Sequence, residues 1–225
     1  MPVSGAVPKR VDVATRSPFV SSAGRAQLAQ VLILVAISVV AAAGLILFLL
    51  PEGDGAGSDS LLMGMPANVV LVPIQAIAAG AALLGWATWL SRVVANIPSL
   101  TGEYPNVPPM YAFLESLVPV ANLYWIPSIL RDVMTRIKAG GRGEALMIGA
   151  WLCFVGAIFL PRLNIFASFI APELGDAIAS IGLIGLVAVI LQVIGGVQLV
   201  MLIQHIEAVV AARRAEPKPA EPAAS

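Results

Sequence analysis

The stretch LAQVLILVAISVVAAAGLILFLL, Leu28 to Leu50, contains no charged residue and is followed directly by Pro51. The hydrocarbon core of a bilayer is about 30 Å thick and needs roughly 20 helical residues to cross it, so this stretch is long enough to span a membrane. The composition agrees, because 59% of the residues are hydrophobic and only 12% are charged, against roughly a quarter in soluble domains. The sequence therefore predicts an all-α integral membrane protein.

A cleaved signal peptide is the other interpretation of this first stretch, because a basic tail precedes it. The apolar run is much longer than the roughly 7–15 residues of a signal-peptide core, and no clear small-x-small cleavage site closes it. We therefore expect residues 28–50 to remain as a membrane anchor.

Three further segments are apolar and long enough to predict membrane-spanning helices, namely residues 67–90, 145–160 and 179–203. The third span of the four is the shortest, because Pro161 and Arg162 end it unless the helix continues through IFASFI. Gly182, Gly185 and Gly196 in the last span, and Ala78, Ala82 and Gly85 in the second, predict seams where helices approach closely.

Basic residues are distributed unevenly along the chain. In the four-span topology, 12 of the 13 lysines and arginines lie on one side and only Arg162 lies opposite, while the loop PEGDGAGSDS has three acidic residues and no base. Because positive charge near span ends is retained in the cytoplasm, both termini are expected to be cytoplasmic, in a plasma (inner) membrane. The tails at 1–27 and 213–225 are rich in Pro, Ala and charge, so they are predicted to be disordered around a membrane domain at 28–212.

The segment between the second and third spans predicts a helical hairpin on the cytoplasmic side. We expect short helices at 110–118 and 127–137, with a break at Pro119 to Asn122, because a proline inside a helix lacks an N–H donor and clashes with the preceding turn. Irregular backbone is tolerated at the membrane interface, the depth that Tyr124 and Trp125 favour. The hairpin is thus expected to be interfacial or a shallow re-entrant element.

The second of these short helices has an amphipathic pattern. Apolar Ile129, Leu130, Val133 and Ile137 share one side, and the opposite side is mostly polar, with Arg131, Asp132, Thr135, Arg136 and Lys138. Basic side chains near an anionic leaflet favour lipid contact, and Asp132 is also spaced to pair with Arg136 at i, i+4.

The residues WLSRVVAN, 89–96, and PVANLYWIPSILRDVMTR, 119–136, with Pro108-Pro109 between them, resemble the bacterial domain-of-unknown-function family numbered 4328. The matching positions are Trp89, Arg92, Asn96, Pro119, Asn122, Leu123, Pro127, Arg131 and Asp132. The chain has Leu117-Val118 where many relatives place an aromatic residue, and it lacks the zinc ribbon that some members append. The resemblance implies a four-span membrane topology and no activity, because the family is uncharacterised.

The candidate contacts with lipid or a protein partner come from the hairpin and the end of the second span: Arg92, Asn96, Pro119, Asn122, Tyr124, Trp125, Pro127, Arg131, Asp132 and Arg136. Arg92 and Asn96 share a helical face and are expected either to bind a phosphate or a partner carboxylate, or to anchor the helix end. Gln75, Gln192 and Gln198 are candidate interior polar contacts, either with neighbouring helices or along a substrate path.

Motifs for catalysis, metal binding or cofactor binding are absent from the sequence. His205 is the single histidine, Glu207 is two residues away and so on a different helical face, and Cys153 is the single cysteine. No charged residue lies deep in a predicted span, which weighs against a proton-coupled transporter. No nucleic-acid partner is expected.

The sequence favours a non-enzymatic membrane scaffold or accessory subunit, whose hairpin contacts lipid, a protein partner or a second copy of the chain. The alternative is a channel or carrier for a small or amphipathic molecule, with the three glutamines in a shared interior.

Overall fold

The computed structural model describes residues 18–49, 61–62, 65–170 and 183–215. Most of both predicted disordered tails, residues 1–17 and 216–225, lies outside these ranges. The parts of the tails that are described differ from the prediction, because helices extend into them at Ala23 and as far as Ala215.

The fold is helical apart from one short strand pair. The helices are α1 (Ala23–Leu49), α2 (Ala67–Thr101), α3 (Pro109–Leu117), α4 (Pro119–Ile137), α5 (Arg142–Ile170) and α7 (Leu183–Ala215). The two-residue strands β1 (Leu61–Leu62) and β2 (Met65–Pro66) pair antiparallel ahead of α2. Helices α1, α2, α5 and α7 are each long and apolar enough to cross a membrane. The prediction of a four-span, multi-pass membrane protein is thereby supported.

The spanning helices are longer than the apolar runs that predict them. Helix α2 continues eleven residues past Leu90 and ends at Thr101, where Gly102 has φ 74° and donates its N–H to the Pro98 carbonyl. Glycine adopts this left-handed conformation without steric cost, and it closes the helix. Helix α5 continues past Pro161 to Ile170, as the sequence allowed. An apolar run marks only the part of a helix that can lie in lipid. The backbone hydrogen bonds of the helix continue beyond the end of that run.

The predicted break at Pro119 to Asn122 is wrong. The connection between α3 and α4 is the single extended residue Val118 (φ −93°, ψ 111°), and α4 begins at Pro119 and continues through Pro127. Pro109 and Pro119 each occupy the first turn of their helix. A proline there removes an N–H that would have no intrahelical acceptor, and its φ already suits a helix. These two prolines therefore start helices, and the interior Pro127 is tolerated at the loss of one backbone hydrogen bond.

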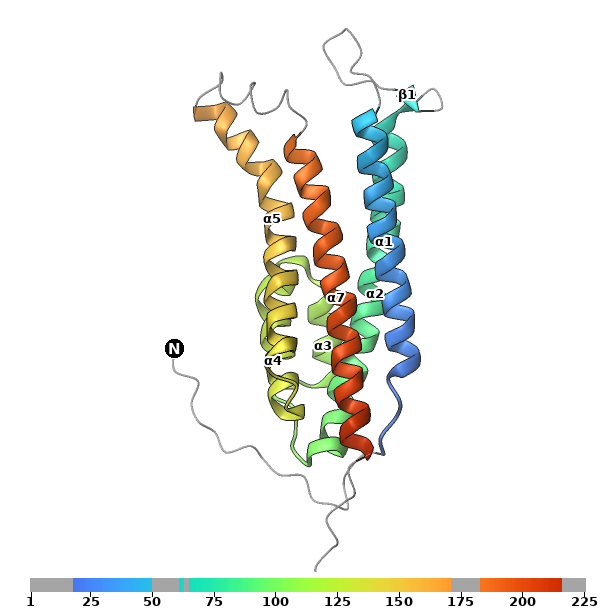
Figure 1. Ribbon diagram of the computed structural model, residues 1–225, viewed down its shortest axis with the longest axis vertical. Coiled ribbons are helices and arrows are strands. Elements are labelled where there is room, and N and C mark those ends of the chain that lie inside the picture. The colour runs from blue at the N-terminus through green and yellow to red at the C-terminus, as the bar shows by residue number, and fades with distance from the viewer. Residues whose placement is uncertain (1–17, 50–60, 63–64, 171–182, 216–225) are drawn as a thin grey trace, which may run out of the picture.

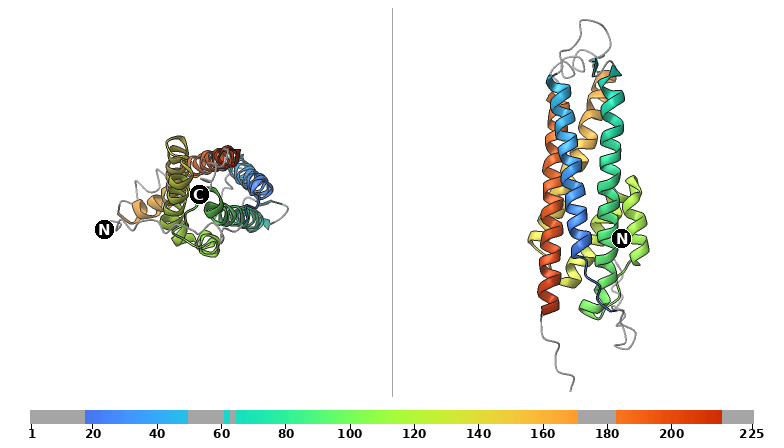
Figure 2. Two further views of the ribbon diagram at one scale, coloured as in Figure 1. Left: turned by 90° about the horizontal axis from the view of Figure 1, so that it is seen from below. Right: turned by 90° about the vertical axis from the view of Figure 1, so that its right-hand side faces the viewer.

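The long helices form an open row rather than a closed four-helix bundle. Helix α7 packs against both α5 and α1, and α1 packs against α2, but among the described residues α2 and α5 make no contact. Helices α3 and α4 lie between them in the lower half of the molecule (Figure 1), and α4 contacts α2, α5 and α7. Seen from below in Figure 2, α7, α1 and α2 follow one another, and α3 and α4 lie on the remaining side.

The main hydrophobic core is built around α4. Its apolar residues Ile129, Leu130, Val133 and Ile137 are buried together with residues of every other described helix. The face that the amphipathic pattern suggested for the membrane surface is therefore directed into the protein. A second, much smaller cluster joins Ala43 of α1 to Leu71 of α2.

Two of the predicted small-residue seams are confirmed. A Cβ at Gly85 would lie 3.2 Å from the Ala29 Cα, and one at Gly196 would overlap the Ile37 side chain of α1. A Cβ added at Gly185 would have no atom within 4 Å, and Gly182 lies outside the described residues. Close approach thus joins α1 to α2 and to α7.

Leu130→Ala tests whether α4 holds the core together. Truncating this side chain, 2% exposed, leaves a cavity where the helices meet, and we expect a loss of about 2 kcal/mol or more of unfolding free energy. The measurement is unfolding of the detergent-solubilised protein by sodium dodecyl sulfate. Leu114→Ala, the same substitution at a side chain 44% exposed, is the matched control and should cost about 0.5 kcal/mol or less. Equal losses in the two variants would contradict this assignment of the core.

Candidate functional site

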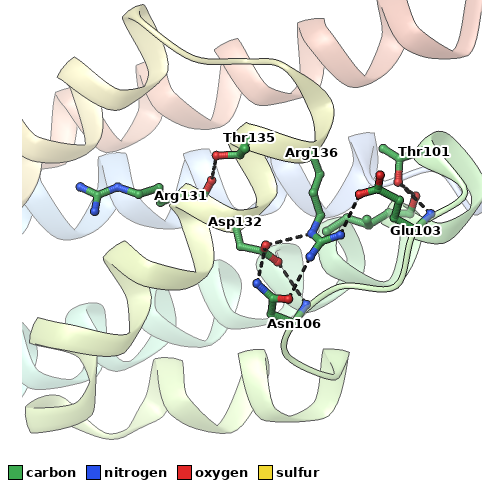
Figure 3. Close-up of polar contacts among 8 residues, drawn as sticks. Thr101, Glu103, Asn106, Arg131, Asp132, Thr135 and Arg136 are labelled. Atoms are coloured by element: carbon green, nitrogen blue, oxygen red, sulfur yellow. Dashed lines mark hydrogen bonds and ion pairs between the residues drawn. The ribbon is translucent and has the colours of Figure 1, made fainter. Parts of the chain in front are cut away.

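Arg136 is the centre of a polar network that joins α4 to the connection between α2 and α3 (Figure 3). Its Nε donates to Asp132 Oδ1, its NH1 to Glu103 Oε2 and its NH2 to Asn106 Oδ1, each at 2.9 Å. Asn106 in turn donates its side-chain amide to Asp132 Oδ1 at 2.7 Å and its backbone N–H to Oδ2 at 3.2 Å. Two carboxylates therefore share one guanidinium, and the connection is fastened to the helix.

This network uses two of the residues predicted to contact lipid or a partner. The i, i+4 pair of Asp132 with Arg136 is confirmed. The Arg136 side chain is only 10% exposed, however, and its guanidinium is occupied by partners inside the protein. Glu103 and Asn106 were not singled out, because they lie in an irregular connection with no periodic pattern that would place them beside α4.

Asn96 also has an internal partner. It is 2% exposed, its Nδ2 donates to the Val20 carbonyl at 2.8 Å, and its Oδ1 accepts the Val20 N–H at 3.2 Å. The side chain thereby satisfies both backbone groups of a residue in the segment before α1, as a paired strand would.

Trp89, which the family resemblance included, has a clear structural role. Its indole Nε1 donates to Glu207 Oε1 of α7 at 2.8 Å, and the ring is completely buried. Arg92 lies three residues later on the same helix, and its Nε is buried without a hydrogen-bond partner in the part of the chain that the structure describes. A second such group is Glu115 Oε2 on α3.

The C-terminal end of α4 is docked on α7. Lys138 adopts a left-handed conformation, φ 56°, and Ala139 donates its N–H to the Met134 carbonyl. The Ala139 carbonyl accepts a hydrogen bond from His205 Nε2 at 3.1 Å, and the Ile137 carbonyl accepts one from Arg213 Nε at 3.3 Å. The single histidine therefore caps a helix end, where carbonyls lack intrahelical donors.

Large apolar side chains remain exposed on the hairpin. Met110 is 70% exposed, Tyr124 is 75% exposed, and the others are Tyr111, Leu114, Val118 and Trp125. We call these six residues the α3–α4 apolar surface. Tyr124 and Trp125 meet edge to face, with ring centroids 5.9 Å apart.

The other predicted contact residues lie near this surface without forming one site. Pro119 and Asn122 are in the first turn of α4, and their side chains are outside the described part of the chain. Pro127 is half-buried within the helix. Arg131 is largely exposed and forms a long ion pair with Glu144, with Nε and Oε1 3.5 Å apart.

The three glutamines are only partly buried, and they come from two helices, α2 and α7. Gln198 of α7 lies against α5, because a Cβ at Gly149 would be 2.7 Å from its Oε1. Within the described ranges that buried oxygen has no hydrogen-bond partner. Gln75 is on α2, which hardly touches α7, and Gln192 is six residues before Gln198 on α7. Among the described residues there is no group of three His, Cys, Asp or Glu side chains that could hold a metal ion.

Arg136→Gln tests the network. The change leaves Asp132 and Glu103 close together without their shared cation, so we expect a loss of about 1–3 kcal/mol of unfolding free energy and faster amide hydrogen exchange in residues 102–108. Arg131→Gln removes the same charge from an exposed pair and should cost about 0.5 kcal/mol or less, with unchanged exchange. If the amides of residues 102–108 exchanged at the same rate in the two variants, the Arg136 network would not hold the connection between α2 and α3.

The chain matches the family described as Domain of unknown function (DUF4328) over residues 64–219, which is more than half of its length and includes α2, the hairpin, α5 and α7. No curated protein and no solved structure was found to match it. The residues that the resemblance rested on, from Trp89 to Asp132, all lie within the matched range. The chain is therefore a member of the DUF4328 family.

Proposed function

We propose that this protein is a non-enzymatic membrane scaffold or accessory subunit whose α3–α4 apolar surface contacts the lipid of the cytoplasmic leaflet. The observation that carries the proposal is the exposure of this surface on an otherwise well-packed hairpin. Six large apolar side chains exposed on two short adjoining helices would be costly in water, and exposed apolar patches mark membrane or protein interaction sites.

The opposite side of the hairpin makes this surface rigid. Ala112 of α3 and Ile129 and Leu130 of α4 are buried in the main core, and Arg136 fastens the connection before α3. A surface backed in this way can present its aromatic residues to lipid without reorganisation.

The lengths of the helices favour a shallow re-entrant hairpin. Helix α3 folds back alongside the lower half of α2 (Figure 2), and its nine residues are about 14 Å long, half of what a bilayer crossing needs. In this arrangement Val118 lies deeper in the leaflet than the charged network of Glu103, Asp132 and Arg136. Tyr124 and Trp125 are residue types that favour the interfacial layer.

The distribution of basic residues supports an orientation with both termini in the cytoplasm. Helix α1 begins, and α2 and α7 end, at the same end of the molecule (Figure 1), and α5 begins there after the Gly140-Gly141 turn. With 12 of the 13 basic residues assigned to this side, the positive-inside rule favours the cytoplasm, in a bacterial plasma membrane.

The scaffold hypothesis is favoured over the channel or carrier. A carrier of the kind considered would need Gln75, Gln192 and Gln198 to face one polar interior. Gln198 instead contacts α5 at Gly149, and Gln75 belongs to a helix at the other end of the row.

Tryptophan quenching by brominated lipid tests the contact of the α3–α4 apolar surface with lipid. In vesicles of phosphatidylcholine brominated along its acyl chains, we expect Trp125→Phe to lower the quenched fraction of the fluorescence, because the half-exposed Trp125 lies against lipid. Trp86→Phe is the control and should leave the quenched fraction no lower, since Trp86 is buried. If Trp125→Phe changed nothing, lipid would not reach this surface and the proposed lipid contact would be wrong.

Cysteine labelling tests the orientation. Gly140 is exposed, and a Cβ there meets no atom within 4 Å, so Gly140→Cys in a Cys153→Ser background should fold normally. We expect a membrane-impermeant maleimide to label it in inside-out vesicles only, with the Cys153→Ser chain as the background control. Labelling in right-side-out cells would reverse the proposed topology.

A further inference from the structure

A groove of about 400 Å³ lies where the N-terminal end of α1 meets the C-terminal end of α7, on the lower end in Figure 1. We propose that it binds the phosphate group of a membrane lipid. The residues that the argument uses are Phe19, Ser21, Ser22, Ala23, Glu207 and Arg214, all of which line the groove. The proposal does not depend on the α3–α4 apolar surface, which belongs to other helices.

The first turn of α1 supplies backbone donors. Ala26 donates its N–H to the Ser22 carbonyl, so the earlier N–H groups, from Ala23 to Arg25, come before the regular hydrogen-bond ladder. The only acceptor that the described residues offer them is Ser21 Oγ, which lies 3.4 Å from the Ala23 nitrogen. Unpaired N–H groups and the positive end of the helix dipole together favour an anion at this position.

Ser22 provides an independent indication of a ligand. It is 1% exposed, it lines the groove, and its Oγ has no hydrogen-bond partner among the described residues. Native structures rarely leave a buried hydroxyl without a partner, and a phosphate oxygen in the groove would accept its hydrogen bond.

Arg214 supplies a positive charge across the groove. Its guanidinium carbon lies 4.9 Å from the centre of the Phe19 ring, a cation–π arrangement that holds the side chain beside the groove. The described residues give it no carboxylate partner. Two other arginines lie at the same helix ends, Arg25 in the first turn of α1 and Arg213 next to Arg214. Arg25 already donates to the Thr88 carbonyl, and Arg213 to the Ile137 carbonyl.

Glu207 is the one acidic residue among those that line the groove. Its Oε1 accepts the Trp89 indole hydrogen, which fixes the carboxylate, but its negative charge still opposes an anion. The sign of this effect provides a test, because removing that charge should strengthen phosphate binding.

The position along α1 favours a lipid phosphate. Ser22 is six residues before Leu28, where the apolar run begins, and this corresponds to about 9 Å along the helix. The headgroup layer occupies roughly 5–8 Å on each side of the hydrocarbon core. Ser22 therefore lies at the outer edge of the headgroup layer, where the phosphate of a lipid headgroup can reach the groove.

Native mass spectrometry of the full chain in a phosphate-free detergent tests the proposal, with dioctanoyl phosphatidylglycerol and inorganic phosphate as the two probes. We expect one phosphatidylglycerol per chain. Arg214→Gln should weaken its affinity roughly tenfold or more, because a charge-assisted hydrogen bond is lost. Ser22→Ala should weaken it several-fold, and Glu207→Gln, which keeps an acceptor for Trp89, should strengthen it.

Arg142→Gln is the matched control, because it removes the same charge at the same end of the molecule, at the start of α5. The Arg142→Gln chain should bind phosphatidylglycerol with the same affinity as the unmodified chain. A loss of affinity as large as that of Arg214→Gln would overturn the proposal in favour of a general charge effect. Competition by inorganic phosphate at similar concentration would identify free phosphate, rather than lipid, as the source of the bound group. No binding of either probe, or unchanged binding in both Arg214→Gln and Ser22→Ala, would also overturn it.

Discussion

The rest of the structure depends on the burial of one face of α4 between helices that do not otherwise meet. Helices α2 and α5 make no contact in the described chain, and α4 packs against both of them and against α7. Its buried residues, from Ile129 to Ile137, bring all six described helices into one core. Without them the spanning helices would form an open row, joined mainly by neighbouring pairs and by the few contacts of α2 with α7. The hairpin is therefore an integral part of the fold and not an appendage at the membrane surface.

Polar contacts fix the position of α4 at the ends of that core. Arg136 binds the connection before α3. The Ile137 carbonyl at the end of α4 accepts a hydrogen bond from Arg213 of α7, and the Ala139 carbonyl just after α4 accepts one from His205. Trp89 and Asn96 join α2 to α7 and to the segment before α1 in the same way. Charged and aromatic residues that would suggest a site in another protein are here used to assemble the helices. What they leave free is the α3–α4 apolar surface and the groove beside Arg214.

Several predictions failed for one physical reason, which is that a pattern within a segment does not identify what the segment packs against. Pro119 was expected to break a helix, yet it starts one, because the residue before it already has an extended conformation. The amphipathic helix was expected to lie at the membrane interface, but α2, α5 and α7 cover the apolar side of α4. Asn96 was expected either to bind a ligand or to anchor the helix end, and neither alternative named its partner, Val20, which is distant in sequence. The sequence contains no periodic or local pattern that identifies these partners.

The sequence by itself determined the class of the protein, the four spanning segments and the family, because hydrophobic length and local motifs are properties of one segment at a time. It also determined that Asp132 and Arg136 pair, since they are one turn apart on one helix. Only the tertiary structure decided that α4 fills the space between α2 and α5, that Glu103 and Asn106 complete the Arg136 network, and that Ser22 meets Arg214 across a groove. These contacts join residues far apart in the chain, and they form only when helix packing brings their elements together.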